Sequence, residues 1–273
     1  MTYLCIIKSN YTLQKKSPMK KLPLLLCFIA LTWMACSQHS AKPNSNSNLR
    51  LMSYNIRNAK GMDNVLDCQR IADIIIREAP HTVAVQEIDS MTTRSGQRYI
   101  LGEIAKHTNM HATYAPAIDH QGGKYGIGIL SREKPLAIEH HPLPGREESR
   151  MLLLVEFKKY YFCCTHFSLT EEDRLTSIAI IKEIAMNHTN KPFFLAGDLN
   201  ANPNTKEMKL LQEDFAILND TEAFTFPASE PSVTIDYIAA SKHSKGAYTL
   251  HSTHVVHEPV ASDHSPLTVE LNP

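Results

Sequence analysis

The sequence predicts an α/β domain whose sheets are mixed, not purely parallel. Three observations support this prediction: short β-branched or aromatic runs alternate with helical patterns, 43% of the residues are hydrophobic, and two of the runs are separated by a turn-length gap. Those two runs, Met151 to Phe157 and Tyr160 to His166, predict a hairpin and therefore antiparallel pairing. No Pro-, Gly- or Ser-rich linker interrupts the chain after about residue 50, so one domain is expected over residues 49–273.

Nine segments are predicted as strands because short apolar runs end at polar or turn-forming residues. They are Leu51 to Asn55, Val83 to Glu87, Gly126 to Ser131, Met151 to Phe157, Tyr160 to His166, Pro192 to Ala196, Ile235 to Ala240, Tyr248 to Val256 and Pro266 to Leu271.

Four helices are predicted from apolar residues that recur at helical spacing. The one that begins at Glu171 has the clearest signal, because Thr170 is a suitable N-cap and three acidic residues occupy the electropositive first turn. The four helices run from about Leu66 to Glu78, from Gly96 to His107, from Glu171 to Met186 and from Lys206 to Glu213.

The N-terminal part of the chain has the pattern of an export signal. Lys20 and Lys21 precede the apolar run from Leu22 to Ala35, which ends at Cys36, and residues 37–48 form a polar linker. The run holds about 14 residues, whereas a membrane-spanning helix needs about 20, so a permanent transmembrane helix is the weaker interpretation.

The end of this signal resembles a bacterial lipobox, which predicts cleavage before Cys36, lipidation of Cys36 and an exported, membrane-anchored protein. Trp33 departs from the usual aliphatic residue of a lipobox, and an ordinary secretory signal is the alternative. Met19 stands directly before the two lysines and is an alternative start of the translated chain.

Processing at Cys36 changes the charge of the protein. Residues 1–36 hold five lysines and no acidic residue, so the full-length net charge of zero becomes −5 in the mature chain. A net-negative chain provides no general attraction for polyanions. The mature chain also keeps an odd set of three thiols that predicts no disulfide framework, and one of the adjacent pair Cys163 and Cys164 is expected in the core.

Polar side chains follow several of the apolar strands, where a rigid scaffold presents them to a loop-lined cleft. Asn55 and Glu87 end two such strands and offer oxygen ligands of the kind Mg²⁺ prefers, with Mn²⁺ as the alternative ion. Asp198 and Asn200 follow a third strand, where a carboxylate can take a proton from water and an amide can donate to a phosphoryl oxygen.

Acid and imidazole groups occur at three further strand ends. Asp236 lies in an apolar strand, while Asp263 and His264 stand at the entry to the last strand, where a carboxylate beside an imidazole fixes its tautomer and raises its basicity. His166 ends the strand that begins near Tyr160. Each of these residues also has a structural interpretation when taken alone, as a turn residue or a hydrogen-bonded histidine.

Together these motifs resemble the endonuclease/exonuclease/phosphatase superfamily, whose members include DNase I, apurinic endonucleases, sphingomyelinases and inositol polyphosphate phosphatases. The resemblance covers nearly the whole mature chain, and six short motifs occur in the family's order. They are Ser53-Tyr54-Asn55-Ile56, Gln86-Glu87, Thr165-His166, Gly197-Asp198-Leu199-Asn200, Ile235-Asp236-Tyr237-Ile238 and Ser262-Asp263-His264-Ser265-Pro266.

The resemblance implies a DNase I-like four-layer α/β sandwich, in which two mixed, mainly antiparallel sheets pack face to face with helices outside. It also implies an Mg²⁺-dependent hydrolase of phosphate esters and a role for each motif residue. Asn55, Glu87 and Asp263 resemble the metal-side residues. His166 resembles a donor to the scissile phosphate, Asp198 the base or water-orienting acid, Asn200 its partner, and Asp236 with His264 an acid and imidazole pair.

The substrate is less well specified than the reaction. Stretches such as Gly122-Gly123-Lys124-Tyr125-Gly126 and Leu143-Pro144-Gly145-Arg146-Glu147 resemble a subgroup of bacterial metal-dependent hydrolases that has relatives among lipid-directed phosphodiesterases. Lys124, Arg146 and Arg150 are candidates for holding a non-reacting phosphate or headgroup. A membrane anchor and an acidic chain favour a phospholipid or a small phosphate ester over nucleic acid, with a secreted nuclease as the alternative.

Two further alternatives carry less weight. A non-catalytic binding protein on the same fold is disfavoured because all the expected polar positions are filled. A zinc site at His251, His254 and His257 is disfavoured because three-residue steps alternate between the two faces of a strand. A monomer is expected.

Overall fold

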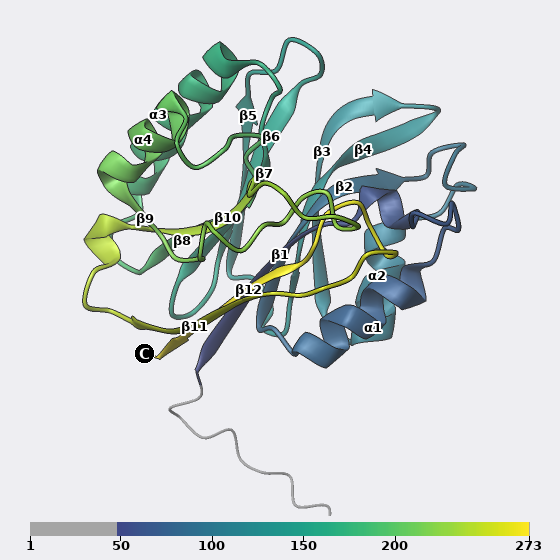
Figure 1. The fold of residues 1–273 in the computed structure, drawn as a ribbon, viewed down its shortest axis with the longest axis horizontal. Helices are drawn as coiled ribbons and strands as arrows, with labels where there is room; N and C mark the ends of the chain where they lie inside the picture. Colours follow the sequence, from purple (N-terminus) through teal and green to yellow (C-terminus); the bar gives the residue numbers. More distant parts are fainter. Residues whose placement is uncertain (1–47, 273) are drawn as a thin grey trace, which may run out of the picture. The chain divides into compact units, whose positions relative to one another are not determined.

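Two six-stranded β-sheets form the centre of the part of the chain that this computed structural model describes, residues 48–272 (Figure 1). The first sheet has the order β11-β12-β1-β2-β4-β3 and the second the order β5-β6-β7-β8-β10-β9. The strands are β1 (Leu49–Asn55), β2 (Thr82–Ser90), β3 (His111–His120), β4 (Gly123–Ser131), β5 (Ala137–Leu143), β6 (Arg150–Glu156), β7 (Tyr161–His166), β8 (Phe193–Asp198), β9 (Phe215–Ile217), β10 (Asp236–Ser241), β11 (Thr249–Val255) and β12 (Leu267–Asn272).

Both sheets have the same pattern of strand directions. The central pair is parallel, β1 with β2 in one sheet and β7 with β8 in the other, and every other neighbouring pair is antiparallel. The predicted hairpin is β6 and β7, paired antiparallel from Leu152 opposite Thr165 to Glu156 opposite Tyr161. The predicted mixed, mainly antiparallel sheets are therefore confirmed.

Helices cover the outer face of each sheet, which gives four layers (Figure 1). Apolar side chains of α1 and α2 pack on the first sheet, and those of α3 and α4 pack on the second. The helices are α1 (Cys68–Glu78), α2 (Ile100–Thr108), α3 (Glu171–Asn187) and α4 (Lys206–Asp214), with 3-10 turns η1 (Arg57–Ala59) and η2 (Lys242–Ser244).

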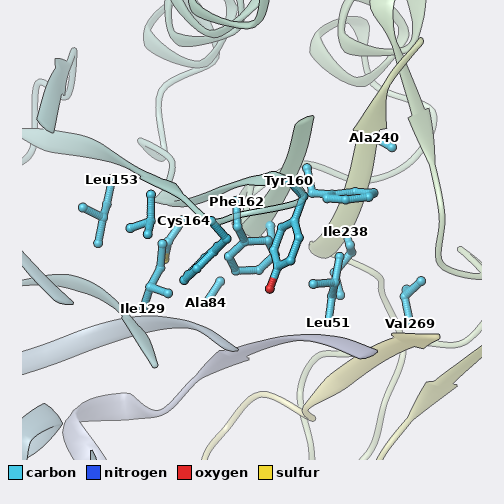
Figure 2. Packing of buried hydrophobic residues seen from close by; sticks show 14 of the residues in the cluster. Leu51, Ala84, Ile129, Leu153, Tyr160, Phe162, Cys164, Ile238, Ala240 and Val269 are labelled. Atoms are coloured by element: carbon cyan, nitrogen blue, oxygen red, sulfur yellow. The ribbon is translucent and has the colours of Figure 1, made fainter. Parts of the chain in front are cut away.

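The central hydrophobic cluster lies between the two sheets and draws on both of them (Figure 2). Leu51 and Val269 of the first sheet and Phe162 and Ile238 of the second are fully buried there. The three clusters are built from residues between Leu49 and Leu271, so the described part of the chain contains a complete core of its own.

Three strands of the structure were absent from the sequence-based prediction: β3, β5 and β9. All three lie at the edges of their sheets, and only two residues of β3 and one of β5 are buried. Half-exposed edge strands lack the continuous apolar run that identified the others. Helix α2 also begins later than predicted, because Gly96 and Gln97 adopt left-handed backbone conformations that a helix cannot include.

The predicted signal, the lipobox at Cys36 and the Met19 start lie outside the described residues. Within residues 48–272, none of the helices has the length and apolar character needed to cross a bilayer. Cys163 and Cys164 are both fully buried, because β7 is covered by the other sheet on one face and by helices on the other, so the expectation that only one would be in the core was wrong.

Candidate active site

The predicted polar residues meet at one end of the two sheets. Asn55 is the last residue of β1, His166 the last of β7 and Asp198 the last of β8, while Asp236 is the first residue of β10. The pairing places Asp198 directly beside His166 on one side and Asp236 on the other. Two parallel pairs that end together therefore bring side chains far apart in sequence into one site.

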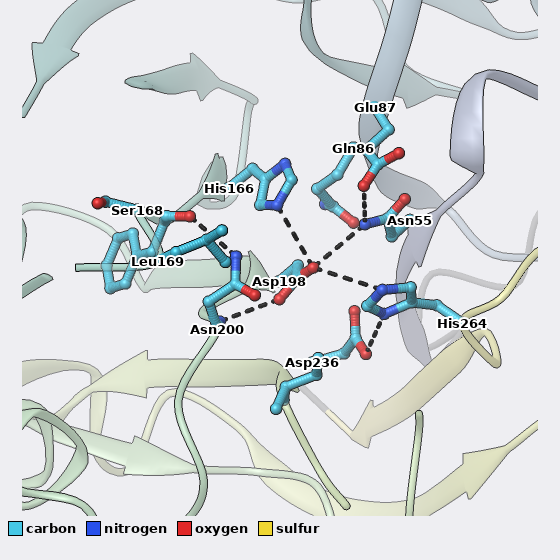
Figure 3. Close-up of polar contacts among 12 residues, drawn as sticks. Asn55, Gln86, Glu87, His166, Ser168, Leu169, Asp198, Asn200, Asp236 and His264 are labelled. Carbon is cyan, nitrogen blue, oxygen red and sulfur yellow. Dashed lines mark hydrogen bonds and ion pairs between the residues drawn. The ribbon is translucent and has the colours of Figure 1, made fainter. Parts of the chain in front are cut away.

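Asp198 is the centre of this site (Figure 3). Its Oδ2 accepts a hydrogen bond from Asn55 Nδ2 at 3.1 Å and lies 3.5 Å from His166 Nε2 and 3.6 Å from His264 Nε2. Its Oδ1 accepts from the backbone N–H of Asn200 at 3.0 Å. The carboxylate is 2% exposed, so its position is fixed by protein groups on all sides.

His264 and Asp236 form a buried pair. His264 Nδ1 lies 2.9 Å from Asp236 Oδ2, and the Phe226 ring packs against the imidazole at 4.8 Å between centroids. Burial alone lowers the pKa of His264, but the nearby carboxylates, Asp236 foremost, outweigh burial and raise its pKa to about 10. The imidazole is therefore positively charged at neutral pH when no cation is bound.

His166 has the opposite ionisation. Burial lowers its pKa to about 4, and the attraction of Asp198 only partly offsets this, while Arg150 and His264 add to the lowering. At neutral pH His166 is thus an uncharged imidazole with one N–H donor. The two histidines that flank Asp198 are distinguished by their surroundings, one neutral and one cationic.

A β-bulge turns Glu87 toward the site. The pairing of β2 with β4 shifts between Val85 and Ile88, and Glu87 adopts a left-handed backbone with φ 59°. Its Oε1 accepts from Asn55 Nδ2 at 3.0 Å. Bulges beside active sites commonly re-aim a side chain, and a non-glycine residue at positive φ is held there only by its surroundings.

Asp263 lies at the same end of the molecule, in the loop before β12. Its Oδ2 is 3.7 Å from Arg57 Nε. The neighbouring Ser262 hydroxyl donates to the carbonyl of Asn55 at 2.7 Å and so ties this loop to the end of β1. Burial raises the pKa of Glu87, and the charges of Asp263 and Asp198 raise it further.

Asn200 contacts Asp198 through its backbone, and its side chain is directed elsewhere. Its Nδ2 donates to the Phe167 carbonyl at 2.9 Å, and its φ of 48° allows the chain to turn back at the end of β8. The side chain therefore joins the segments that follow β7 and β8, and this contact holds two of the site's strand ends together.

The donor set fits a hard divalent cation. Glu87 and Asp263 are partly exposed and Asp198 is buried, and burial first, then the charges of Asp263 and Asp198, raise the pKa of Glu87. A bound cation would favour the charged form of such carboxylates. Asp236 Oδ1 and Gln86 Oε1 are buried acceptors with no hydrogen-bond partner among the described residues. The site is thus rich in oxygen acceptors.

A second possible ligand group overlaps the first. Within residues 48–272, Asp198, Asp236 and His264 are the one set of acids and histidines whose ligand atoms all lie within 4.8 Å of one another. His264 already engages Asp236 through Nδ1, so a cation there would displace or compete with that hydrogen bond. On the Glu87 side a cation would instead replace the hydrogen bond that Asn55 Nδ2 donates to Glu87.

The three candidate substrate-binding cations differ in their placement. Arg150 is buried, pairs with Glu148 at 2.7 Å, and leaves its Nε without a partner among the described residues. It begins β6, whose Leu152 pairs with Thr165 next to His166, and its charge lowers the pKa of His166. Lys124 is exposed and pairs with Asp119, and Arg146 is exposed and pairs with Asp173 at 3.4 Å, so of the three only Arg150 joins the site.

Sequence reasoning missed a second cluster next to Glu87. Arg94 pairs with the fully buried Asp89 at 2.7 and 2.8 Å, and its guanidinium lies 5.3 Å from the centre of the Tyr125 ring. These residues anchor the loop after β2. Arg94 lies in that loop outside any regular pattern, so no sequence signal identifies it.

The histidines at positions 251, 254 and 257 do not form a site. His251 and His254 are exposed along the edge strand β11, and His257 is exposed just after it. The disfavoured zinc interpretation thus gains no support from the positions of these side chains.

A family model for the Endonuclease/Exonuclease/phosphatase family matches residues 52–264. The curated proteins contain no match to the sequence.

Solved structures with the same fold include an endonuclease/exonuclease/phosphatase from Beutenbergia cavernae DSM 12333 (TM-score 0.69, 23% identity, covering 82% of this chain and 71% of that one). A mannosyl-6-phosphatase from Bacteroides thetaiotaomicron VPI-5482 has a TM-score of 0.63 and 18% identity over 82% of this chain and 99% of its own. The human Nocturnin catalytic domain with bound sulfate has a TM-score of 0.64 and 17% identity over 82% and 93%.

At these identities the structural likenesses establish the fold alone, whereas the family model spans most of the chain and reaches from β1 to His264. The four layers, the two parallel central pairs and the strand-end polar site agree with that match. The chain belongs to the endonuclease/exonuclease/phosphatase family, whose members are hydrolases of phosphate ester bonds.

Proposed function

We propose that this protein is an Mg²⁺-dependent phosphodiesterase that cleaves a lipid headgroup or another small phosphate ester by attack of water. The observation that carries the proposal is the position of Asp198, which lies between a neutral His166 and a cationic His264 and beside the acidic cluster of Glu87. Hydrolysis of an anionic phosphodiester needs charge neutralisation and an oriented base, and this arrangement offers both.

Glu87, Asn55 and Asp263 would hold the cation, directly or through water. When bound, Mg²⁺ would neutralise charge on the phosphate. Mg²⁺ is preferred over Zn²⁺ because the available groups are carboxylate and amide oxygens. Mn²⁺ accepts the same ligands and is the alternative ion.

Asp198 is the base in this proposal. It takes a proton from water as the water oxygen bonds to phosphorus and the bond from phosphorus to the leaving oxygen breaks. His264 is already protonated through Asp236, so it cannot accept that proton and instead donates a hydrogen bond. His166, uncharged, donates its single N–H toward a phosphoryl oxygen.

Arg150 is the candidate for a non-bridging phosphate oxygen or a headgroup anion. Its guanidinium is buried, its charge acts on His166, and its Nε has no hydrogen-bond partner among the described residues. Lys124 and Arg146 are weaker candidates for binding the substrate, since each is paired with an acidic residue other than Asp198.

The proposal places the enzyme outside the cytoplasm, anchored through a lipid on Cys36. Its support is the signal-like run from Leu22 to Ala35 followed by the cysteine. An anchored enzyme with a mature net charge of −5 suits a phospholipid or a small ester better than DNA, and the fold of the mannosyl-6-phosphatase is compatible with the small ester.

The test uses the chain from Ser37 to Pro273, stripped with EDTA and returned to Mg²⁺. Release from bis-p-nitrophenyl phosphate is compared with cleavage of a phospholipid panel and of plasmid DNA. Asp198→Ala and His264→Ala serve as inactive variants, while His254→Ala on the exposed edge strand serves as the matched control.

Metal-dependent turnover that both site variants lose and His254→Ala retains would support the proposal. Turnover without added metal, or turnover that survives Asp198→Ala, would contradict the assigned chemistry. Preference for plasmid DNA over every phospholipid would favour the nuclease alternative.

A further inference from the structure

Exposed apolar side chains collect on the loops around the active-site end of the molecule. The loops that follow β1, β2 and β7, and those that precede β10 and β12, all open at this end, because the site residues stand where those strands end or begin. Six large apolar residues on these loops are between 39% and 68% exposed. These six, here called the apolar rim, are Met62, Val65, Met91, Leu169, Phe224 and Val260.

Two parts of the apolar rim are held in fixed positions. Met62 donates its backbone N–H to the Val260 carbonyl at 2.8 Å, which joins the loop after β1 to the loop before β12. Leu169 donates its backbone N–H to Glu147 Oε1 at 2.7 Å, so its side chain projects from an anchored turn. Exposed apolar side chains grouped on one surface mark protein–protein or membrane interaction sites.

Three of the cations beside the rim are paired with acids, while Lys60, Asp220 and Glu222 on the same loops form no ion pair among the described residues. Arg70 pairs with Asp63 at 2.7 Å, Arg57 lies 3.7 Å from Asp263, and Lys124 contacts Asp119. Paired cations release no counterions on contact with a polyanion, so they add little affinity for nucleic acid. An electrically neutral surface is the better complement to this end of the molecule.

We infer that the apolar rim inserts into a zwitterionic phospholipid surface and delivers a membrane-embedded phosphodiester to Asp198. This inference rests on the proposed function and refines its substrate class to a lipid presented in a bilayer. The location of the rim around the active site favours a phospholipid bilayer. If the rim inserts partly, the active site would lie at the depth of the phosphates of the phospholipid headgroups.

The test measures binding separately from turnover. The chain from Ser37 to Pro273, which lacks the predicted lipid anchor, is sedimented with phosphatidylcholine vesicles in EDTA at physiological salt. Leu169→Glu and Val260→Glu alter the rim. Met186→Glu and Ile76→Glu alter equally exposed apolar residues on the outer helices, since Met186 matches Leu169 at 68% exposed and Ile76 is close to Val260 at 50% against 45%.

Each rim substitution is expected to weaken vesicle binding about tenfold or more, because a partly inserted side chain loses its apolar transfer energy. The helix substitutions should leave binding unchanged, and all four variants should keep wild-type turnover of soluble bis-p-nitrophenyl phosphate. Wild-type protein that fails to sediment with vesicles, or helix variants that weaken binding equally, would overturn the inference. If the wild-type protein does not hydrolyse soluble bis-p-nitrophenyl phosphate, the proposed function would be refuted instead.

Discussion

The charge on His264 depends on one neighbour, Asp236. Asp236 raises the pKa of His264 more than any other group and so offsets the lowering caused by burial. Asp236→Asn removes this anion, so the pKa of His264 should fall from about 10 by about one unit or more. The measurement is a histidine NMR titration of the metal-free protein, in which His264 is assigned by comparison with His264→Ala.

An exposed pair provides the control for that titration. Glu139→Gln changes the partner of His141, whose Nε2 lies 2.9 Å from that carboxylate, and should leave the His264 titration untouched. A His264 resonance that titrates near 6.5 in the wild type would show that Asp236 does not hold the proton in solution.

The sequence predicted which polar residues would lie together at the strand ends, and it did not predict how they contact one another. Asn55, His166, Asp198 and Asp236 all stand at strand ends, where sequence patterns mark both the strand and its boundary. The backbone turn that directs Glu87 toward Asn55 depends on a bulge in β2, where the step from Val85 to Ile88 faces a shorter step along β4. The local sequence pattern does not show where that pairing shifts.

At the scale of elements, β7 and β8 must lie close together for His166 to meet Asp198. A Cβ on Gly197 would stand 2.0 Å from the Thr165 carbonyl, on the strand paired with it. Gly197→Ala should therefore separate the two strands, lower the free energy of unfolding by about 1–3 kcal/mol and abolish most turnover. Thermal denaturation and the bis-p-nitrophenyl phosphate assay measure the two effects.

Gly96→Ala is the matched control, because a Cβ there meets no atom within 4 Å and the substitution costs only the left-handed backbone. It should reduce stability by about 1–2 kcal/mol and preserve turnover. Equal turnover in both alanine variants would show that the β7 and β8 spacing does not set the site geometry.

Glu147 joins the loop between β5 and β6 to the segment after β7. Its carboxylate accepts from Leu169 N at 2.7 Å, Ser168 Oγ at 2.9 Å and Arg150 Nη2 at 3.1 Å. Burial alone raises the pKa of Glu147, but these donors outweigh burial and hold it at about 2. Because the folded pKa is below the unfolded value of about 4.3, this contribution to stability is complete above the unfolded pKa and disappears as pH falls toward 2.

Glu147→Gln should therefore destabilise the protein by about 1 kcal/mol at pH 7, a figure reduced for solvent screening of a partly exposed group. The difference from wild type should shrink between about pH 5 and pH 2, as measured by urea denaturation across that range. A difference that stays constant with pH would mean that the loop is held by contacts other than this carboxylate.

The elements themselves were predicted best where they are buried on both faces. Helix α3 was expected to end at Met186 and ends at Asn187, and the strands that carry site residues were expected within a few residues of their observed bounds. The edge strands β3 and β5 were missed because exposed side chains carry no apolar periodicity. Strand pairing, not local pattern, defines such strands.

At the scale of the whole molecule, alternating strands and helices and one short hairpin predicted mixed sheets, but the division into two sheets did not follow from them. Both sheets repeat the same directions about a parallel central pair, and that arrangement requires contacts between segments as distant as β1 and β12. Of the sequence features, only the resemblance of the ordered motifs to the family implied four layers.

The distribution of charge over the whole molecule distinguishes a lipid substrate from DNA. Wild-type chain from Ser37 to Pro273 should bind a short DNA duplex weakly and with little salt dependence, because Arg57, Arg70 and Lys124 near the site are paired with acids. Asp63→Asn with Asp119→Asn would free two of them and should strengthen binding at low salt, steepening its salt dependence. Glu213→Gln with Asp214→Asn adds the same charge beside Lys182, on the outer helices, and should do neither. Fluorescence anisotropy across a salt series measures both variants. Tight, steeply salt-dependent binding by the wild type would make the nuclease the better interpretation, since it would show a cationic surface that the observed ion pairs do not provide.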